Sequence, residues 1–260
     1  MSSRSEQKQR ARAEREAAER EAARSAGRRR RLYSLGAAVL AAAVMVAVAV
    51  AIGSSGSSKP KTSGASAKSD VTAVAQLLSG IPQSGNRLGM ASAPVTIDYY
   101  GDLQCPVCRD FTLGALPELI STDVRAGTVK LRYRSLQTAT ADLATFRQQQ
   151  VAALAAGRQR RLWHYVELFY RQQGTENSGY VTGPFLQRIA EQVPGLDLSA
   201  WTAARDNAAL TAEVTADGAA AARAAAAATP TLIIAGPKGT RTAGDLSYAG
   251  IAADIAAVSS

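Results

Sequence analysis

Only two cysteines occur in the chain, and Cys105 and Cys108 stand two residues apart in the segment DLQCPVCRDF. Two cysteines cannot make the disulfide framework of a small cysteine-rich protein, so the fold has to depend on a packed core. The chain has 260 residues, of which 47% are hydrophobic. One sizeable domain with accessory segments is therefore expected.

The formal net charge of +9 is unevenly distributed along the chain. Residues 1–32 hold 11 Lys/Arg against 5 Asp/Glu, whereas residues 71–260 hold 16 against 15. Because the body has no basic stripe interleaved with aromatic residues, no nucleic-acid partner is expected. We predict that residues 1–32 form a basic cytoplasmic tail that sets topology, the alternative being a segment that binds a partner or acidic lipid head groups.

Residues 33–52 run for 20 positions without a charge, which is long enough for one helix to cross a bilayer. The arginines at 28–31 directly precede this run, so the positive-inside rule puts the N-terminus in the cytoplasm and the rest of the chain outside. A cleavable signal peptide is the alternative, although its apolar region is usually shorter. Residues 53–70 are rich in Gly and Ser and predict a flexible linker, with the domain proper at 71–260.

The remaining pattern predicts an α/β fold with mixed strand directions. The expected order is a strand, a helix that starts at the cysteines, a second strand, a helical block, two strands and a closing helix. The first strand is residues 94–101, the helix from the cysteines runs through Ile120 with Pro117 as a candidate kink, and the second strand is 128–136. The helical block is 141–228. The last two strands are 230–236 and the one after the 237–240 turn, and the closing helix is 249–259.

A CxxC pair has three common uses. A closed zinc site needs four ligands, and this chain offers one such pair and a single histidine, His164, so no metal is expected. A structural disulfide would close a loop of only a few residues and would constrain the unfolded chain little. Reversible redox chemistry is favoured because the pair follows a strand and opens a helix.

At such a junction, Cys105 would lie at the helix N-terminus, where free N–H groups and the helix dipole stabilise a thiolate. Pro106 suits the first helical position, and Val107 adds no charge between the thiols. Cys108 would lie one turn further in. We therefore expect Cys105 to be the attacking thiol and Cys108 the resolving thiol, with no cofactor.

The sequence resembles the thioredoxin superfamily, and within it the DsbA-like thiol:disulfide oxidoreductases of bacterial envelopes. Four segments carry the resemblance: APVTIDYYGDLQCPVCRDF, ATPTLII, the helical block between them, and RLWHYVELFYRQQ within that block. The resemblance implies a thioredoxin-like fold with a helical insertion at about 141–228. It also implies that Pro230 is cis beside Cys105, and that Thr229 presents its backbone to an extended substrate.

Two positions depart from the family pattern. A buried carboxylate often stands about six residues before the first cysteine, but Tyr99 occupies that position here. Asp98 is a weak candidate for the proton acceptor, because strand alternation turns it to the opposite face, and Asp102 is nearer but expected in the loop. The usual Gly before Thr-Pro is replaced by Ala227-Ala228.

The resulting hypothesis is a membrane-anchored, extracytoplasmic oxidoreductase that introduces disulfides into exported proteins. Such an enzyme needs a membrane redox partner to reoxidise it. A reductase or isomerase of the same fold is the near alternative. A thioredoxin-like binding or chaperone module without redox activity is the other alternative, and replacing Cys105 by Ser distinguishes the two classes.

Overall fold

The computed structural model describes residues 64–259, so the predicted tail at 1–32, the anchor at 33–52 and most of the linker lie outside the described part. Within that part, no helix has both the length and the apolar character needed to cross a membrane. The elements are α2 Gly64–Leu78, β1 Gln83–Ser84, β2 Arg87–Leu88, β3 Val95–Gly101, α3 Pro106–Leu113, α4 Leu116–Leu119, the π-helix η1 Ile120–Val124, β4 Val129–Ser135, α5 Leu143–Gly157, α6 Leu162–Arg171, α7 Gly183–Gln192, α8 Leu198–Arg205, α9 Ala208–Arg223, β5 Thr231–Gly236, β6 Gly239–Thr242 and α10 Tyr248–Val258.

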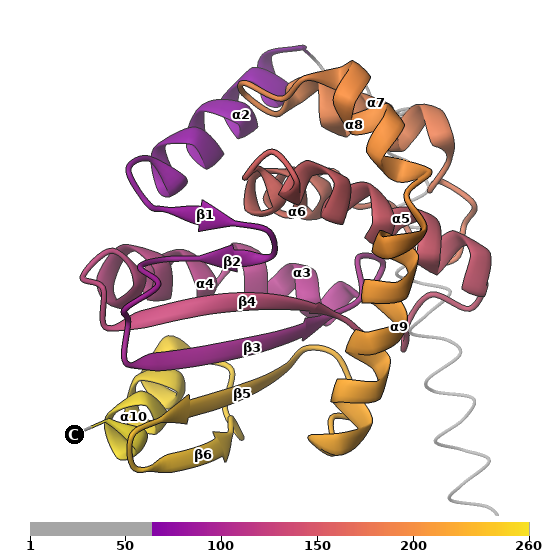
Figure 1. The fold of residues 1–260 in the computed structure, drawn as a ribbon. Helices are drawn as coiled ribbons and strands as arrows, with labels where there is room; N and C mark the ends of the chain where they lie inside the picture. Colours follow the sequence, from indigo (N-terminus) through magenta and orange to yellow (C-terminus); the bar gives the residue numbers. More distant parts are fainter. Residues whose placement is uncertain (1–63, 260) are drawn as a thin grey trace, which may run out of the picture. The chain divides into compact units, whose positions relative to one another are not determined.

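A six-stranded sheet organises the domain, in the order β1-β2-β4-β3-β5-β6. The central strands β3 and β4 are parallel, and every other neighbouring pair is antiparallel. The prediction of an α/β fold with mixed strand directions is therefore confirmed. In Figure 1 the helices α5 to α8 and α2 lie together above the sheet, while β5, β6 and α10 lie at its other edge.

Alternation along β3 assigns its residues to two faces. Val95, Ile97 and Tyr99 are buried in the main core together with both cysteines, whereas Asp98 and Tyr100 point to the opposite side. The helices α3, α4 and α10 cover the first face, and the rings of Tyr99 and Phe111 pack edge to face there. Helix α9 packs against β4 on the second face. Helix α3 thus lies on the same face of the sheet as Tyr99.

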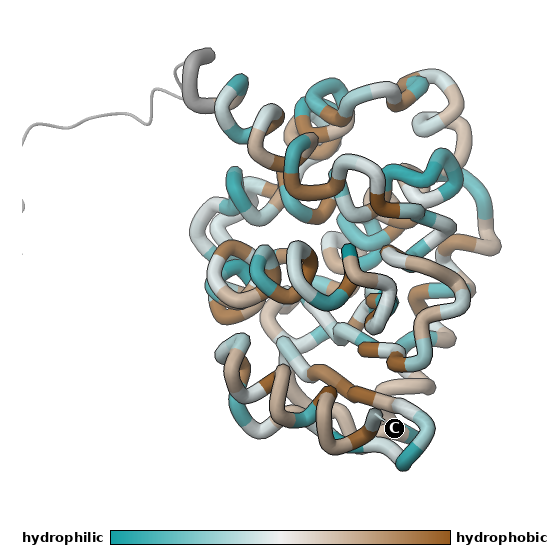
Figure 2. Tube along the Cα trace, turned by 90° about the vertical axis from the view of Figure 1, so that its left-hand side faces the viewer, coloured by the Kyte–Doolittle hydropathy of each residue, from teal (hydrophilic) through white to brown (hydrophobic). Residues whose placement is uncertain are grey.

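Helix α6 is the centre of the helical layer. All of its residues from Leu162 to Tyr170 are buried, as expected for a helix that has neighbours on every side. It contacts α2, α3, α5 and α7. Helix α5 is likewise buried without interruption from Gln149 to Gly157. Helices α7 and α9 bury one side only, and hydrophobic and hydrophilic positions recur along the chain in Figure 2.

Several local predictions need correction. Helix α2 begins at Gly64, so residues 64–70 are helical and not linker, and Asp70 pairs with Arg171 at 3.6 Å. The predicted helix after the cysteines breaks at Gly114, while Pro117 lies in the first turn of α4, where a missing N–H costs nothing. The short strands β1 and β2 were not predicted, because two residues each are too few to show alternation.

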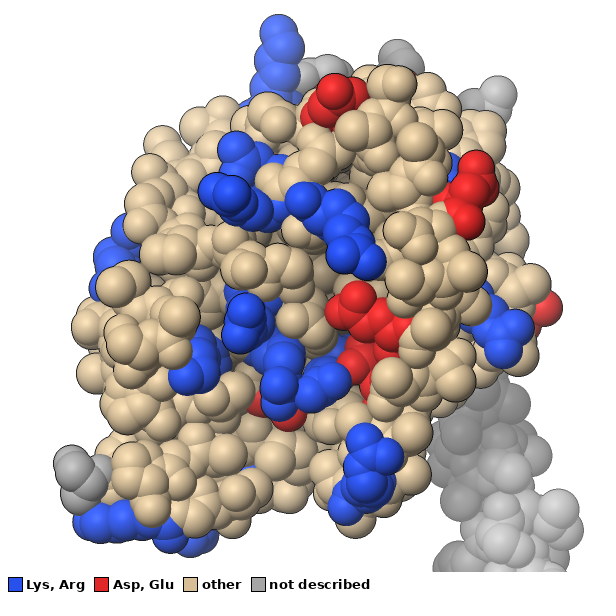
Figure 3. Space-filling view, viewed as in Figure 1, with Lys and Arg blue, Asp and Glu red and all other residues tan. Residues whose placement is uncertain are grey.

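The predicted helical insertion at 141–228 is also too long at its C-terminal end. Its last helix, α9, belongs to the sheet, because Asp217 bonds to the Ser135 N–H (2.9 Å) and to Arg134 (2.8 Å) at the end of β4. Figure 3 views the side of the sheet on which α9 lies, and Lys and Arg side chains gather there beside Asp and Glu. The helical insertion is therefore α5 to α8, residues 143–205.

Candidate active site

Cys105 is the N-cap residue of α3, and Pro106 follows in the first turn. This is the predicted arrangement: β3 ends at Gly101, a short loop follows, and the helix starts one residue after Cys105. The Cys105 side chain accepts the N–H of Cys108 at 3.4 Å, as the side chain of an N-cap does. The sulfur is therefore held against the positive end of the helix.

The surroundings of Cys105 favour its thiolate. The pKa of Cys105 falls from 9.0 to about 6, first because the Cys108 side chain bonds to it and further because Thr229 and the N–H groups of Cys108 and Val107 do so. Partial burial opposes this fall. In the thiol form, the Sγ–H donates to the Thr229 carbonyl oxygen at 3.3 Å.

Cys108 has the opposite character. It is 0% exposed, and burial raises the pKa of its thiol well above 9.0. Both thiols are free in this structure. Cys105 is itself only 5% exposed. An acidic thiol beside a fully buried and protonated one is the division of roles expected for an attacking and a resolving cysteine.

The Thr229–Pro230 peptide bond is cis, as the resemblance implied. This bond directly precedes β5, which pairs with β3, and so the loop lies beside the start of α3. The three neighbours of Cys105 differ in exposure: Val107 is 53% exposed, while Thr229 and Pro230 are half-buried. A segment that approaches the Cys105 sulfur therefore meets these three residues.

Tyrosine side chains occupy the core behind the thiols. The Tyr99 hydroxyl lies 3.4 Å from the Cys108 carbonyl oxygen and 3.4 Å from the Tyr170 hydroxyl, and Tyr170 donates to the Asp102 carbonyl oxygen at 3.1 Å. Burial raises the pKa of Tyr99 and of Tyr170 well above 10.0. These hydroxyls stay protonated and act as hydrogen-bonding groups behind the thiols.

Asp98 does not serve as the proton acceptor of the thiols. Its carboxylate forms a two-pronged ion pair with Arg132, and Arg134 lies 3.8 Å away. It also projects from the face of β3 opposite to Tyr99, and Tyr99 is the residue that contacts Cys108. The weak sequence candidate is therefore corrected to a structural ion pair on the α9 side of the sheet.

Asp102, three residues before Cys105, lies in the loop between β3 and α3, as the sequence predicted. It is 0% exposed, and its carboxylate accepts six hydrogen bonds. The donors are the N–H groups of Gln104, Thr138, Ala139 and Thr140, the Thr140 hydroxyl and the Gln149 amide. Four of these donors belong to residues 138–140, which follow Asp102 by 36 to 38 positions, so only the tertiary structure reveals them.

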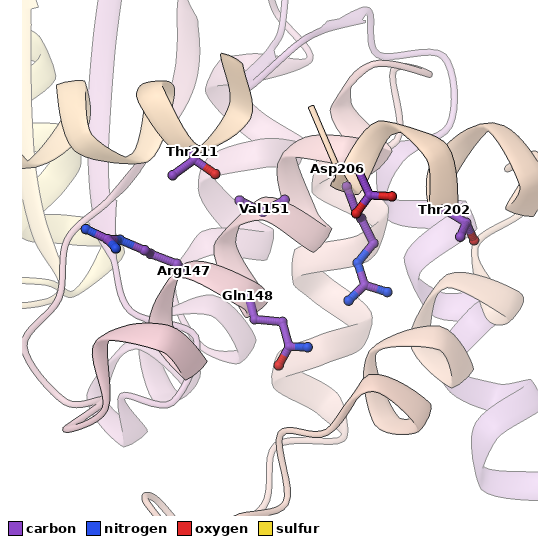
Figure 4. A pocket seen from close by; sticks show the side chains of 7 residues that line it. Arg147, Gln148, Val151, Thr202, Asp206 and Thr211 are labelled. Carbon is purple, nitrogen blue, oxygen red and sulfur yellow. The ribbon is translucent and has the colours of Figure 1, made fainter. Parts of the chain in front are cut away.

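Other sites are less informative. Among residues 64–259, no cluster of three or more His, Cys, Asp or Glu could hold a metal ion. A pocket of about 410 Å³ lies between α5, α8 and α9, and no residue of the thiol site lines it. Its polar side chains do not converge, since Arg147 extends away from Gln148 and Asp206 (Figure 4).

Comparisons with solved structures agree with this geometry at the level of fold. BdbD of Bacillus subtilis, in its oxidised form, is 20% identical and superposes with a TM-score of 0.58, covering 68% of this chain and 96% of that one. DsbA of Chlamydia trachomatis is 16% identical with a TM-score of 0.57, covering 66% and 90%. At such identities, the likeness supports the fold alone.

Sequence comparison adds a relative and a family. A Bacillus anthracis protein described as "Probable disulfide bond formation protein D" is 26% identical over 120 residues, which are 43% of this chain and 51% of that protein. The chain thus spans about half the length of this curated relative. The family described as Thioredoxin matches residues 83–253, which include both cysteines and the Thr229–Pro230 loop. The chain therefore belongs to the thioredoxin family.

Proposed function

We propose that the protein is a thiol:disulfide oxidoreductase that introduces disulfides into exported proteins through Cys105 and Cys108. The observation that carries this proposal is the contrast between the two thiols: the pKa of Cys105 is lowered to about 6, and that of Cys108 is raised. The names of the relatives support the same reaction class. DsbA-type structures and a disulfide bond formation protein are among them.

The chemistry proceeds by two exchanges. A client thiolate attacks the Cys105 sulfur of the Cys105–Cys108 disulfide, the intramolecular S–S bond breaks, and Cys108 leaves as a thiolate and takes up a proton. A second client thiolate then attacks the client sulfur of the mixed disulfide and releases Cys105 as a thiolate. The client loses two electrons, and the cysteine pair gains them.

The stabilised Cys105 thiolate favours this direction. A thiol of low pKa is a good leaving group, so the second exchange is fast, and stabilising the reduced form makes the disulfide more oxidising. A membrane redox partner that accepts the two electrons would return the pair to the disulfide form.

Equilibration in glutathione buffers tests the function. Residues 62–260 contain the whole domain and are suitable for the measurement, with the redox state read by thiol alkylation. We expect a midpoint of about −120 to −180 mV, as for oxidases. A midpoint near about −270 mV would identify a reductase, and a pair that does not exchange would leave a binding module. Cys105→Ser should abolish exchange completely.

We also propose that residues 33–52 anchor the protein in the cell membrane with residues 53–260 outside. The support is the 20-residue uncharged run behind four arginines, together with the preference of stable disulfide chemistry for compartments outside the cytoplasm. Carbonate washing of membranes and protease treatment of intact cells test this topology. Retention in the washed membrane with a protease-accessible domain is expected. Release of a shorter chain would indicate a cleaved signal peptide.

A further inference from the structure

A second pocket, of about 290 Å³, lies where the C-terminal end of α2 meets the start of α6. The two helices pack against each other in the helical layer (Figure 1), and no residue of the thiol site lines the pocket. Its titratable lining residues are Arg160, Arg161 and His164, and no Asp or Glu is among the residues that line it. The pocket is therefore basic, in a domain whose overall charge is nearly balanced.

Neither arginine of the pocket is neutralised by a carboxylate. Arg161 Nε donates to the Pro194 carbonyl oxygen at 2.8 Å, and its Nη1 donates to the Arg160 carbonyl oxygen at 3.2 Å. Within residues 64–259, no Asp or Glu oxygen lies within 4.0 Å of either guanidinium group. Carbonyl oxygens carry no net charge, so Arg161 is held in place and still contributes its full positive charge to the pocket.

His164 adds a buried hydrogen-bond donor to the wall of the pocket. Its side chain belongs to a residue that is only 8% exposed, and Nδ1 lies 3.1 Å from the amide nitrogen of Gln83. In this pairing the amide donates and Nδ1 accepts, so the ring proton is on Nε2. Nε2 has no hydrogen-bond partner in the described part of the chain, although the ring lines the pocket. A buried donor without an acceptor costs free energy, which a ligand that accepts this proton would recover.

The helix ends at the pocket also favour a negative charge. Arg161 is the N-cap of α6 and no side chain caps this helix, so its first turn keeps a partial positive charge. The C-terminal end of α2 would oppose it, but Arg125 donates to the carbonyl oxygens of Leu77 and Ser79 at 2.8 Å each. In agreement, the positive charge of Arg161 adds to burial in lowering the pKa of His164 to about 4.

We propose that this pocket binds the phosphate group of a phosphate ester, with Arg160 and Arg161 supplying the charge and His164 Nε2 donating a hydrogen bond. A phosphate group presents up to three terminal oxygens, one for each of these side chains, and arginine binds such oxygens in pairs. The volume is close to the lower end, about 300 Å³, of pockets that hold small organic ligands, so an organic group fits beside the phosphate. The ester is a small soluble molecule or a lipid head group.

His164 is the only histidine of the chain and is therefore a direct probe of the site. Residues 62–260 form one compact unit, and the ring C–H signals of His164 are followed by NMR in this domain without a histidine tag. Added inorganic phosphate should shift the signals at pH 7 until they saturate, whereas chloride at equal ionic strength should not. Saturating phosphate should also raise the pKa of His164 by roughly one unit, because the anion binds the protonated ring about tenfold more tightly.

Two exposed arginines that are close in sequence give a variant and its matched control. Arg160→Gln removes a charge from the pocket wall and should weaken phosphate binding by roughly tenfold, whereas Arg160→Lys should keep part of the affinity. Arg160 is exposed, so both variants should fold. Arg158→Gln removes the same charge two residues away, at the C-cap of α5, from a side chain that does not line the pocket. It should change the affinity less than about twofold, since water and salt screen it.

The source of the phosphate is decided by two further probes. Saturable binding of glycerol 3-phosphate that Arg160→Gln weakens identifies a soluble ester. Co-sedimentation with phosphatidylglycerol vesicles but not with phosphatidylcholine vesicles, lost in Arg160→Gln, identifies a lipid head group.

Two results would overturn the inference. One is the absence of saturable binding with inorganic phosphate, glycerol 3-phosphate and the vesicles alike. The other is an equal loss of binding in Arg158→Gln and Arg160→Gln, which would show a general attraction between charges and no site. Cys105→Ser should bind phosphate as the wild type does, so the outcome is independent of the proposed thiol chemistry.

Discussion

At the scale of single residues, Glu167 is a buried carboxyl group without hydrogen-bond partners. It lies within α6 with 0% exposure, and neither of its oxygens accepts a hydrogen bond from the described residues. The nearest charge is Arg171 Nη2, 3.7 Å from Oε2. Burial raises the pKa of Glu167 to about 8, and Arg171 offsets only part of that rise. Glu167 is thus uncharged at neutral pH.

This protonation makes stability depend on pH. In the unfolded chain the carboxyl ionises near its ordinary pKa of 4.5, so between pH 4.5 and about 8 folding takes up a proton. The stabilisation from Glu167 is complete below pH 4.5 and is lost as pH rises towards 8. Glu167→Gln should remove this slope and increase the unfolding free energy at pH 8.

Urea denaturation of the disulfide form at pH 6.5 to 8 measures the slope, because neither thiol titrates in that form. His164 also contributes below this range, since burial lowers its pKa from 6.5 to about 4. The comparison of wild type with Glu167→Gln removes such shared contributions. If the unfolding free energies of the two proteins change in parallel with pH, Glu167 is ionised in the folded state.

At the scale of elements, α9 is attached to β4 through one buried carboxylate. Asp217 is 1% exposed and accepts from both Arg134 and the Ser135 N–H. In Asp217→Asn, the amide NH2 would face one of these donors and leave it without an acceptor. We expect the unfolding free energy to fall by about 1–3 kcal/mol.

An exposed pair provides the control for Asp217. Arg241 and Asp254 bond at 2.9 Å between β6 and α10, but the Arg241 side chain is 56% exposed. Asp254→Asn should cost less than about 1 kcal/mol, because water replaces the lost contact. The unfolding free energies are measured by urea denaturation. Equal losses of unfolding free energy in the two variants would contradict the claim that burial makes the Asp217 contact important.

The success of sequence reasoning also differs among elements. The strand before the cysteines was predicted from its run of β-branched and aromatic residues, and the strand at 128–136 from its alternation. The start of α2 was missed, since its first turn, Gly64 to Ala67, has the small polar composition of a linker. Its helix is stabilised by packing on α6, which no local pattern records.

At the scale of the whole molecule, the acidity of Cys105 couples the redox state to folding. In the reduced form, the pKa of Cys105 is about 6 in the folded domain, whereas the unfolded chain has the ordinary value of 9.0. Because folding lowers this pKa, ionisation of Cys105 stabilises the fold. The stabilisation is complete above pH 9.0, the pKa of the unfolded chain, and it is lost as pH falls through 6. The disulfide form has no such contribution.

The difference in unfolding free energy between the reduced and the oxidised forms should therefore grow, in favour of the reduced form, as pH rises from 6 to 8. Cys108 does not disturb this window, because its pKa lies well above 9.0 when folded and near that value when unfolded. Urea denaturation of both forms at several pH values measures the difference. A difference that is constant across the window would show that Cys105 is not acidic in the folded domain.

The sequence by itself determined the two thiols at a strand–helix junction, Pro106 in the first turn, the Thr229–Pro230 pair and the mixed α/β class. The Thr229–Pro230 pair was identified through the family resemblance, and the other features depend on short-range rules of helix capping, proline geometry and side-chain period. Only the tertiary structure decided which polar groups surround the thiols. Cys105 meets Thr229 from 124 positions away, and Asp102 meets the loop at 138–140 from 36 to 38 positions away. Such pairings arise from the packing of the whole sheet and its helices, and buried polar groups must find their partners there wherever the chain brings them together.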